Sequence, residues 1–185
     1  TCALPISCVG RHDLLKCVVA WALERKQRTI TYVNAYCLNT AYQHAAYRAL
    51  LNETDLVYAD GISVVWASKL LGGCALEKIT GRDWIDDFCQ LASRSGLRIY
   101  ILAGKPGIAR TARHNLAQQY PELQIVGHNN GYWDEERCEE VFRDIAAADP
   151  HLLFVGMGSP RQEMWIDAHR EELNVPVCWS VGALF

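Results

Sequence analysis

The stretch HLLFVGMGSPRQEMWIDAHREEL, residues 151–173, decides the fold class. Its apolar run over 151–156 is typical of a buried strand, because side chains on both faces of the run are apolar. Gly156 and Gly158 mark a short loop, and Pro160 stands where a helix over 160–173 would begin. A buried strand that leads through a short loop into a helix is one half of a parallel βαβ unit.

The same alternation continues along the rest of the chain. Short apolar runs rich in β-branched and aromatic residues predict strands over 29–34, 55–58, 97–103, 124–127, 151–156 and 177–181. Longer amphipathic segments predict helices over roughly 12–27, 36–52, 62–71, 83–95, 106–120, 134–148 and 160–173. We therefore expect a single α/β domain over residues 1–185, with a Rossmann-like, mostly parallel sheet flanked by helices.

Composition and charge exclude some classes of protein. The net charge is −3 and the basic residues are scattered, whereas a nucleic-acid-binding protein usually presents a basic face. The eight cysteines stand singly, at positions 2, 8, 17, 37, 74, 89, 138 and 178, mostly within apolar segments. We predict that they are reduced thiols of the core. Neither a CxxC pair nor an HExxH helix points to a zinc site.

The two ends of the chain carry further information. No secretory leader is recognisable, and no apolar run reaches the ~18 residues that a membrane-spanning helix needs. This predicts a cytosolic or peripheral protein. The chain begins at Thr1 rather than Met and stops at Phe185, directly after a strand-like segment, which indicates a fragment of a longer protein.

In open parallel sheets, ligands bind at the carboxyl ends of the strands, where loops lead into helices. The loop that begins at Gly156 and Gly158 lets a ligand approach the backbone, and the helix start behind it favours a phosphate. Arg161 adds a fixed positive charge, and Gln162 can both donate to and accept from a sugar or base. A tight turn with an exposed arginine is the alternative, but the combination favours ligand binding.

Two common nucleotide-binding fingerprints are absent from the sequence. Arg161 stands where the third glycine of the dinucleotide motif belongs, and Lys105 is followed by Pro106 rather than the Ser or Thr of a phosphate loop. Gly104 and Gly107 suit either a second close approach to a ligand or merely a turn.

Asp60 follows an apolar strand and precedes an apolar helix, so two roles are open to it. Its side chain can cap the helix, for which Asp is a favoured residue. Alternatively, a carboxylate at a strand end, partly desolvated by Tyr58 and Trp66, can act as a general base. Asn34, at the end of the first strand, can likewise orient a hydroxyl or satisfy a turn.

Further along the chain, Lys78 and Arg82 precede a helix and can either neutralise a leaving diphosphate or remain solvated loop charges. For Tyr132 and Trp133 we favour packing under a loop over stacking on a base or sugar. The sequence has no Asp-x-Asp pair, which many nucleotide-sugar transferases use to hold a metal. A metal-independent reaction would need cationic side chains to stabilise a departing UDP.

Taken together, the loops resemble a known family. The segments VNAY (33–36), LVYADGISVVWASKLLG (56–72), EKITGRDWIDDF (77–88), IYILAGKPGIA (99–109), IVGHNNGYW (125–133), LLFVGMGSPRQEMWI (152–166) and VGALF (181–185) occur in the order seen in WecG/TagA/CpsF glycosyltransferases. The resemblance covers roughly residues 9–185. Its most specific part is the combination of ADG with the G-x-G-x-P-[KR]-Q-E-x-W block.

The resemblance implies a function. Members of this family transfer N-acetylmannosamine, its uronic acid or glucose from UDP to a polyprenyl-diphosphate-linked saccharide, with inversion, in cell-surface polysaccharide biosynthesis. We also expect no metal and no cofactor, a cytoplasmic location on the inner face of the cell membrane, and either a monomer or a homo-oligomer. Carried over by position, Asp60 becomes the general base and Gln162 an active-site residue. The expected substrate-binding residues are Asn34, Gly61, Lys78, Arg82, Gly104, Gly156, Gly158 and Arg161.

This sequence departs from the family pattern in three ways. Tyr32 replaces a threonine, which puts the usual donor sugar in doubt, and Lys78 replaces an arginine, which removes a bidentate contact to a diphosphate. Because the sequence stops at Phe185, we expect it to lack the C-terminal segment through which family members contact the membrane. The competing interpretations are a nicotinamide-dependent oxidoreductase, which the missing glycine motif disfavours, and a non-catalytic nucleotide-binding module.

Overall fold

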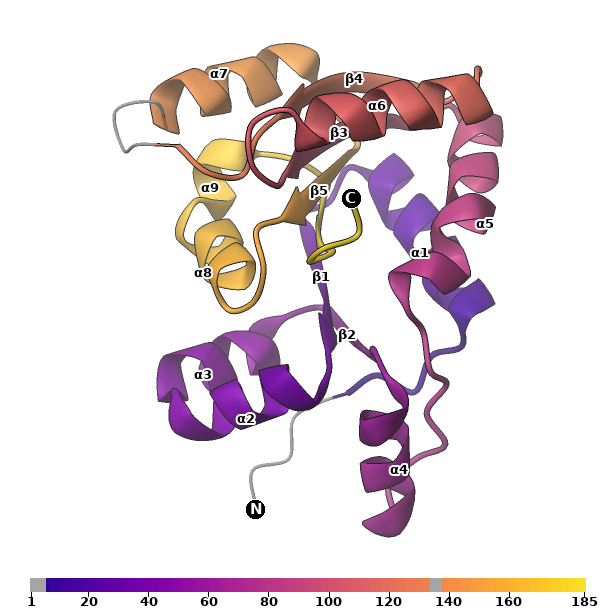
Figure 1. Cartoon of the computed structure of the whole chain (residues 1–185), viewed down its shortest axis with the longest axis vertical. Helices are drawn as coiled ribbons and strands as arrows, with labels where there is room; N and C mark the ends of the chain where they lie inside the picture. The colour runs from indigo at the N-terminus through magenta and orange to yellow at the C-terminus, as the bar shows by residue number, and fades with distance from the viewer. Residues whose placement is uncertain (1–5, 134–137) are drawn as a thin grey trace.

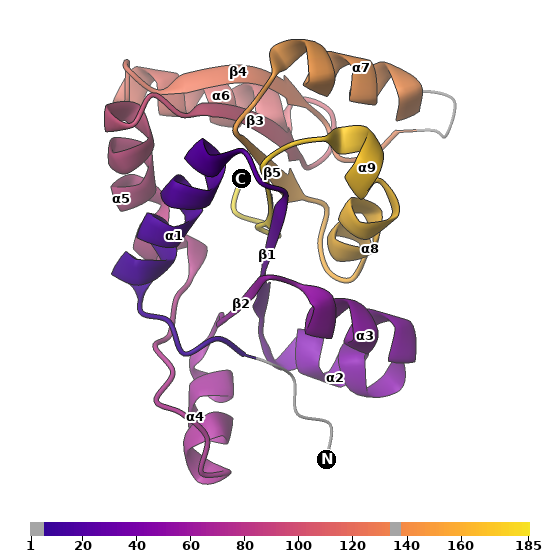
Figure 2. The ribbon, with the colours of Figure 1, turned by 180° about the vertical axis from the view of Figure 1, so that it is seen from behind.

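A computed structural model describes residues 6–133 and 138–185. It contains a six-stranded sheet with the order β2-β1-β6-β5-β3-β4, in which all neighbouring strands are parallel. Helices cover both faces of this sheet (Figures 1 and 2). The predicted Rossmann-like α/β fold is therefore confirmed.

All six predicted strands are present in the structure. They are β1 (Arg28–Val33), β2 (Leu56–Ala59), β3 (Arg98–Ala103), β4 (Gln124–Asn129), β5 (Leu152–Gly156) and β6 (Val177–Ser180). Every residue of β2, β5 and β6 is buried, because helices pack on both faces of a parallel sheet. This explains why these strands are continuous apolar runs rather than alternating ones.

The helices are α1 (Arg11–Glu24), α2 (Ala35–Gln43), α3 (Ala45–Glu53), α4 (Ile62–Leu70), α5 (Gly81–Arg94), α6 (Ile108–Gln119), α7 (Cys138–Ala148), α8 (Arg161–Ala168) and α9 (Arg170–Leu173). None of the described helices is long and apolar enough to cross a membrane. For α7, the predicted start at 134–137 lies outside the described residues.

Two predicted helices were wrong in one respect, because each is divided in two. The segment 36–52 breaks at His44, whose backbone is extended, and 160–173 breaks at His169. At the first break Arg48 donates to the carbonyl oxygen of Ala41 at 3.1 Å and satisfies an acceptor at the end of α2. The break turns α3 so that Tyr47 and Leu51 enter the same core as α2.

An aromatic cluster in the core fixes α5 over the centre of the sheet. Trp84, in the first turn of α5, stacks on Trp179 of β6 with ring centroids 4.2 Å apart. Phe88 packs edge-on against both rings of this pair, and Phe154 stacks on Trp84. Burial of rings this large contributes several kcal/mol each, roughly 3–5 for truncation to Ala. The N-terminus of α5 is thereby held at the carboxyl end of β6.

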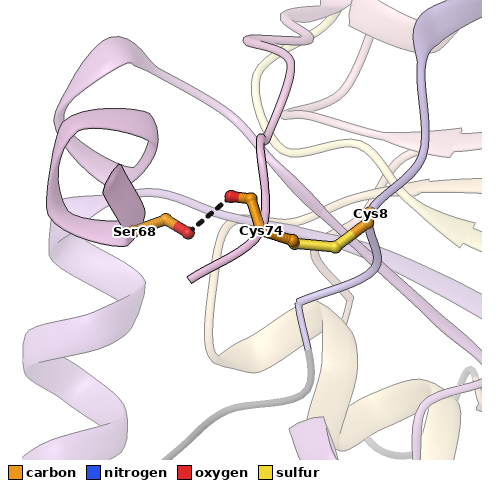
Figure 3. Close-up of a disulfide and its surroundings, with 3 residues drawn as sticks. All are labelled: Cys8, Ser68 and Cys74. Atoms are coloured by element: carbon orange, nitrogen blue, oxygen red, sulfur yellow. Dashed lines mark hydrogen bonds between the residues drawn. A yellow bond between two sulfur atoms is a disulfide. The ribbon is translucent and has the colours of Figure 1, made fainter. Parts of the chain in front are cut away.

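The prediction that all cysteines are reduced core thiols is wrong for one pair. Cys8 and Cys74 form a disulfide between exposed segments (Figure 3). The N-terminal segment reaches Cys74 because Ser7 donates to the carbonyl oxygen of Val57 in β2. Of the other described cysteines, 37, 89 and 178 are buried thiols and 17 and 138 are half-buried. Cys2 lies outside the described residues.

Candidate active site

A cavity of about 770 Å³ opens at the carboxyl ends of β1, β2 and β6, between α5 and α6. This is the edge of the sheet at which ligands bind in related folds. Its lining consists of Tyr32, Asn34, Tyr58, Asp60, Thr80, Gly81, Arg82, Trp84, Ile85, Ile108, Thr111, Ala112, Asn115, Leu116, Val181, Ala183, Leu184 and Phe185. Of the predicted site residues, the cavity brings together Asn34, Asp60 and Arg82.

The side chain of Asp60 is available for chemistry because it does not cap α4. The N-cap of α4 is Gly61, at φ 106°, and α4 has no side-chain cap. The interpretation of Asp60 as a helix cap was therefore wrong. Gly61 supplies the positive φ that turns the chain into α4, and it is not part of the cavity lining.

Burial raises the pKa of Asp60 above its ordinary value. A hydrogen bond from the side chain of Asn34 lowers it, repulsion from Asp83 raises it, and attraction to Lys78 lowers it. Tyr58 lines the cavity beside Asp60 as expected, whereas Trp66 is 65% exposed and absent from the lining. A carboxylate with a raised pKa is a stronger base than one in water.

Asn34 uses the two ends of its amide for different contacts. Its Oδ1 accepts from the backbone N–H of Cys37 at 3.1 Å and so caps α2, which confirms the turn role. The amide N–H₂ group remains free to hydrogen-bond to Asp60. One residue therefore anchors a helix and orients the carboxylate.

Two cationic side chains lie at the start of α5. Arg82 lines the cavity, and Lys78 forms an ion pair with Asp83 at 3.6 Å outside the lining. The N-terminus of α5 is closed by a capping box in which Asp83 accepts from the backbone and hydroxyl of Thr80. These hydrogen bonds hold the pKa of Asp83 below its usual range.

The predicted glycines at the ends of β3 and β5 hold loops together. Gly104 donates to the carbonyl oxygen of Gly156 at 3.0 Å and accepts from Gly131 at 2.8 Å. A Cβ on Gly156 would lie 2.7 Å from the carbonyl oxygen of Gly182. The close packing of one backbone segment against another therefore explains why glycine occupies positions 104 and 156. Neither they nor Gly158, at φ 81°, are part of the cavity lining.

Gln162 is completely buried, and both ends of its amide are bonded to the protein. Its Oε1 accepts from the backbone N–H groups of Gly158 at 3.2 Å and Gly182 at 3.0 Å. Its Nε2 donates to Ser159 at 3.2 Å and Glu163 at 2.7 Å. Because Gly182 stands between two lining residues, Val181 and Ala183, Gln162 braces one wall of the cavity from behind.

Arg161 is exposed, and its guanidinium carbon lies 4.5 Å from the centroid of the Tyr132 ring. Tyr132 in turn donates to the carbonyl oxygen of Met157 at 3.2 Å. Trp133 packs edge-on against Trp165 as predicted. Arg161 and Tyr132 thus stand beside the β5 loop, outside the cavity lining.

Sequence reasoning missed two features of this region. Thr111 and Asn115, one turn apart on α6, face the cavity, and their spacing on an otherwise amphipathic helix was the available signal. Glu163 is buried, and its Oε1 accepts from Thr31 and Ser159 at 2.9 Å each. Burial raises the pKa of Glu163. Within residues 6–133 and 138–185, no group of three His, Cys, Asp or Glu side chains is arranged to hold a metal ion.

The fold and the cavity define a Rossmann-like protein whose candidate ligand site, at the carboxyl ends of parallel strands, contains a half-buried carboxylate. A sequence model of the glycosyl transferase WecG/TagA/CpsF family matches residues 1–185. The chain belongs to this family, which confirms the resemblance seen in the sequence.

Curated relatives agree with this assignment. The N-acetylglucosaminyldiphosphoundecaprenol N-acetyl-beta-D-mannosaminyltransferases of Staphylococcus aureus strains NCTC 8325 / PS 47 and COL are each 33% identical to this chain over 153 residues. The aligned region covers 83% of this chain and 59% of each relative. The chain therefore matches somewhat more than half the length of these enzymes.

Proposed function

We propose that this protein is an inverting, metal-independent glycosyltransferase that moves a sugar from a UDP-sugar to a polyprenyl-diphosphate-linked saccharide in cell-surface polysaccharide biosynthesis. The observation that carries the proposal is the carboxylate of Asp60, which lines the cavity, is released from helix capping and has a raised pKa. The names of the S. aureus relatives favour N-acetylmannosamine over its uronic acid or glucose, and an acceptor that ends in N-acetylglucosamine.

The chemistry is a single displacement. Asp60 takes the proton from a hydroxyl group of the acceptor sugar, and the oxygen attacks the anomeric carbon on the face opposite UDP. The bond between that carbon and the UDP oxygen breaks, its electron pair leaves with UDP, and the configuration inverts. General-base assistance of this kind contributes about 100- to 10,000-fold in rate.

In this proposal, cationic groups stabilise the negative charge that develops on the departing UDP. Arg82 lines the cavity, Lys78 lies close enough to Asp60 to lower its pKa, and the N-terminus of the 14-residue helix α5 points to the same region. Arg161, Gly158 and Gly156 would add contacts from the β5 loop, and Gly61 and Gly104 would border the site. Rates in EDTA equal to those in Mg²⁺ are expected.

Gln162 acts indirectly in this scheme. Its hydrogen bond to Gly182 holds the wall formed by Val181 and Ala183, so that it positions the site rather than reacts. Because the acceptor is anchored in lipid, we place the enzyme in the cytoplasm, at the inner face of the cell membrane.

The experiment that tests this function measures UDP release in the presence of a polyprenyl-linked acceptor, from UDP-N-acetylmannosamine, its uronic acid and UDP-glucose in turn. Release from one donor, lost in Asp60→Asn, supports the proposal. Binding of UDP-sugar without any product would instead indicate a nucleotide-binding module. Quenching of the fluorescence of the six tryptophans by NADH, but not by UDP, would indicate an oxidoreductase.

A further inference from the structure

One helix of the protein has an apolar surface that the fold does not use. In α4 only Val64 is buried, whereas the exposed fractions are 47% for Ile62, 65% for Trp66 and 87% for Leu70. These three residues are spaced by four, so they form one stripe along the helix. Leu71, directly after α4, is also exposed, at 83%, but it lies on the side of Val64, with which it lines a separate groove. Exposed apolar patches of this kind mark surfaces that bind something.

The position of α4 separates it from the rest of the molecule. Figures 1 and 2 show α4 at one end of the long axis, projecting beyond the sheet and the other helices. The Cys8–Cys74 disulfide ties the segment after α4 to the N-terminal segment, and Ser68 of α4 donates to the carbonyl oxygen of Cys74 at 3.0 Å (Figure 3). The stripe is therefore held in place rather than carried on a loose loop.

The charge of this segment indicates what the stripe contacts. The chain as a whole has a net charge of −3, but residues 61–76 contain no Asp or Glu and one Lys, the exposed Lys69. Lys69 lies in the last turn of α4, beside Leu70. Apolar side chains with an interfacial Trp and a basic residue, without acidic ones, are the combination that favours an anionic bilayer surface.

The stripe is also next to the candidate base. Ile62 follows Asp60 by two residues, so the start of α4 and the carboxylate share one turn of backbone. The acceptor in the proposed function is held at the bilayer by its polyprenyl chain, and only a diphosphate separates its first sugar from the lipid. A base that serves this sugar must therefore lie close to the membrane surface.

We propose that the stripe formed by Ile62, Trp66 and Leu70 of α4, together with Lys69, inserts into the headgroup region of an anionic membrane. The occupant of this surface is lipid, and the contact brings the mouth of the cavity to the bilayer. The inference rests on the proposed function for its choice of acceptor, but membrane binding itself requires no catalysis.

The test uses the 185-residue chain and vesicles of phosphatidylcholine with phosphatidylglycerol, without donor or acceptor. The double variant Trp66→Ser, Leu70→Ser is expected to lower the partition coefficient in co-sedimentation at least about tenfold. Lys69→Glu is expected to lower it about tenfold on anionic vesicles and to leave binding to pure phosphatidylcholine unchanged. Leu23→Ser, at an exposed apolar position on α1, is the matched control and should bind as the wild type does.

Circular dichroism and thermal melting of each variant show that the fold is retained, and quenching of Trp66 by brominated lipid provides a second measurement. Quenching that is present in the wild type and reduced in Trp66→Phe supports insertion of α4. Equal vesicle binding by the wild type and the double variant overturns the inference. So does a wild-type dimer that the double variant converts to a monomer without any change in vesicle binding, because the stripe would then bind a second copy.

The two proposals fail separately. If the stripe variants lose vesicle binding but no UDP-sugar supports transfer, the membrane surface stands and the proposed function is wrong. If the wild type transfers sugar to a short-chain, water-soluble acceptor and the stripe variants bind vesicles normally, the function stands and the membrane surface is wrong.

Discussion

The backbone N–H of Asp60 donates to the carbonyl oxygen of Val33 at 2.9 Å. In the β1–β2 pair, Val33 lies opposite Ala59, the last residue of β2. The hydrogen bond from Asp60 continues this pairing one residue beyond the end of β2. The side chains of Asn34 and Asp60, which follow on the two strands, are therefore held next to each other by the sheet. The pairing of β1 with β2 therefore fixes the position of the candidate base.

The first prediction concerns Asp60→Asn. The amide has the same size but cannot accept the proton, so the rate of UDP release should fall at least about a hundredfold. The melting temperature should stay close to that of the wild type, because the side chain caps no helix. Asp167→Asn, an exposed carboxylate on α8, is the control and should retain full activity. Near-normal turnover of Asp60→Asn would remove this residue from the role.

The second prediction concerns the pH dependence of the reaction. The base must be unprotonated, so the acidic limb of kcat/KM should lie above the 3.8 of an ordinary aspartate, because burial raises the pKa of Asp60. The hydrogen bond from Asn34 favours the charged form. Asn34→Ser keeps an acceptor for the cap of α2 but replaces the amide donor by a shorter hydroxyl group, so it should weaken the bond to Asp60 and move the limb to higher pH. If the acidic limb of kcat/KM moved to lower pH in this variant, the hydrogen bond from Asn34 to Asp60 would be contradicted.

The third prediction concerns stability and pH at Glu163. Burial raises its pKa above the ordinary 4.5, so the folded protein keeps a proton that the unfolded chain releases. The contribution of this proton to the free energy of unfolding is fully present below pH 4.5, and it is lost as the pH rises through the pKa that Glu163 has in the folded protein. In Glu163→Gln this loss is absent. The free energy of unfolding of the variant, relative to wild type, should therefore increase with pH above 4.5 in urea titrations. Glu172→Gln, at an exposed site, should show no such trend.

The fourth prediction concerns Gln162→Leu. Leucine has a similar volume but leaves the buried N–H of Gly182 without its acceptor. An unsatisfied buried donor costs about 1–3 kcal/mol, so the free energy of unfolding should fall by that amount. Affinity for UDP should also fall, since the wall at Val181 and Ala183 loses its support. The exposed Gln118→Leu on α6 serves as control, and an equal loss in both variants would contradict the bracing role.

The fifth prediction concerns the disulfide. Cys8 and Cys74 are separated by 66 residues, and closing a loop of this length restricts the unfolded chain. Cys74→Ser should lower the free energy of unfolding by up to about 4 kcal/mol under oxidising conditions. Wild-type protein in dithiothreitol should melt at the temperature of the variant, and insensitivity of the wild type to reductant would show that the bond does not form.

The strands were predictable because their signal is local. Runs such as those of β3 and β5 are apolar on both faces and end at glycines, so the sequence alone indicates both the element and its boundary. The breaks at His44 and His169 were not predictable, because each depends on how the following helix packs. The Cys8–Cys74 pair was missed for the same reason, since it forms through the placement of the N-terminal segment beside β2.

The site was predictable in part. The order of motifs along the chain predicted Asn34, Asp60 and Arg82 as site residues, and the fold places all three around one cavity. Whether Asp60 caps α4 depended on the backbone angles of Gly61, which no residue pattern specifies. From the sequence, the glycines at 104 and 156 could serve either close approach of a ligand or close packing of two loops. The contacts between their loops show the close packing.

The strand order has a consequence for synthesis on the ribosome. β6 comes after the other five strands in the sequence but lies between β1 and β5 in the sheet. Until it emerges, the nascent chain can form only two partial sheets, β2-β1 and β5-β3-β4, each with an unpaired edge. Such edges are prone to pair wrongly, so the nascent chain is most vulnerable to aggregation just before β6 is released. The insertion of β6 joins the two halves and, at the same moment, completes the wall of the cavity at Val181.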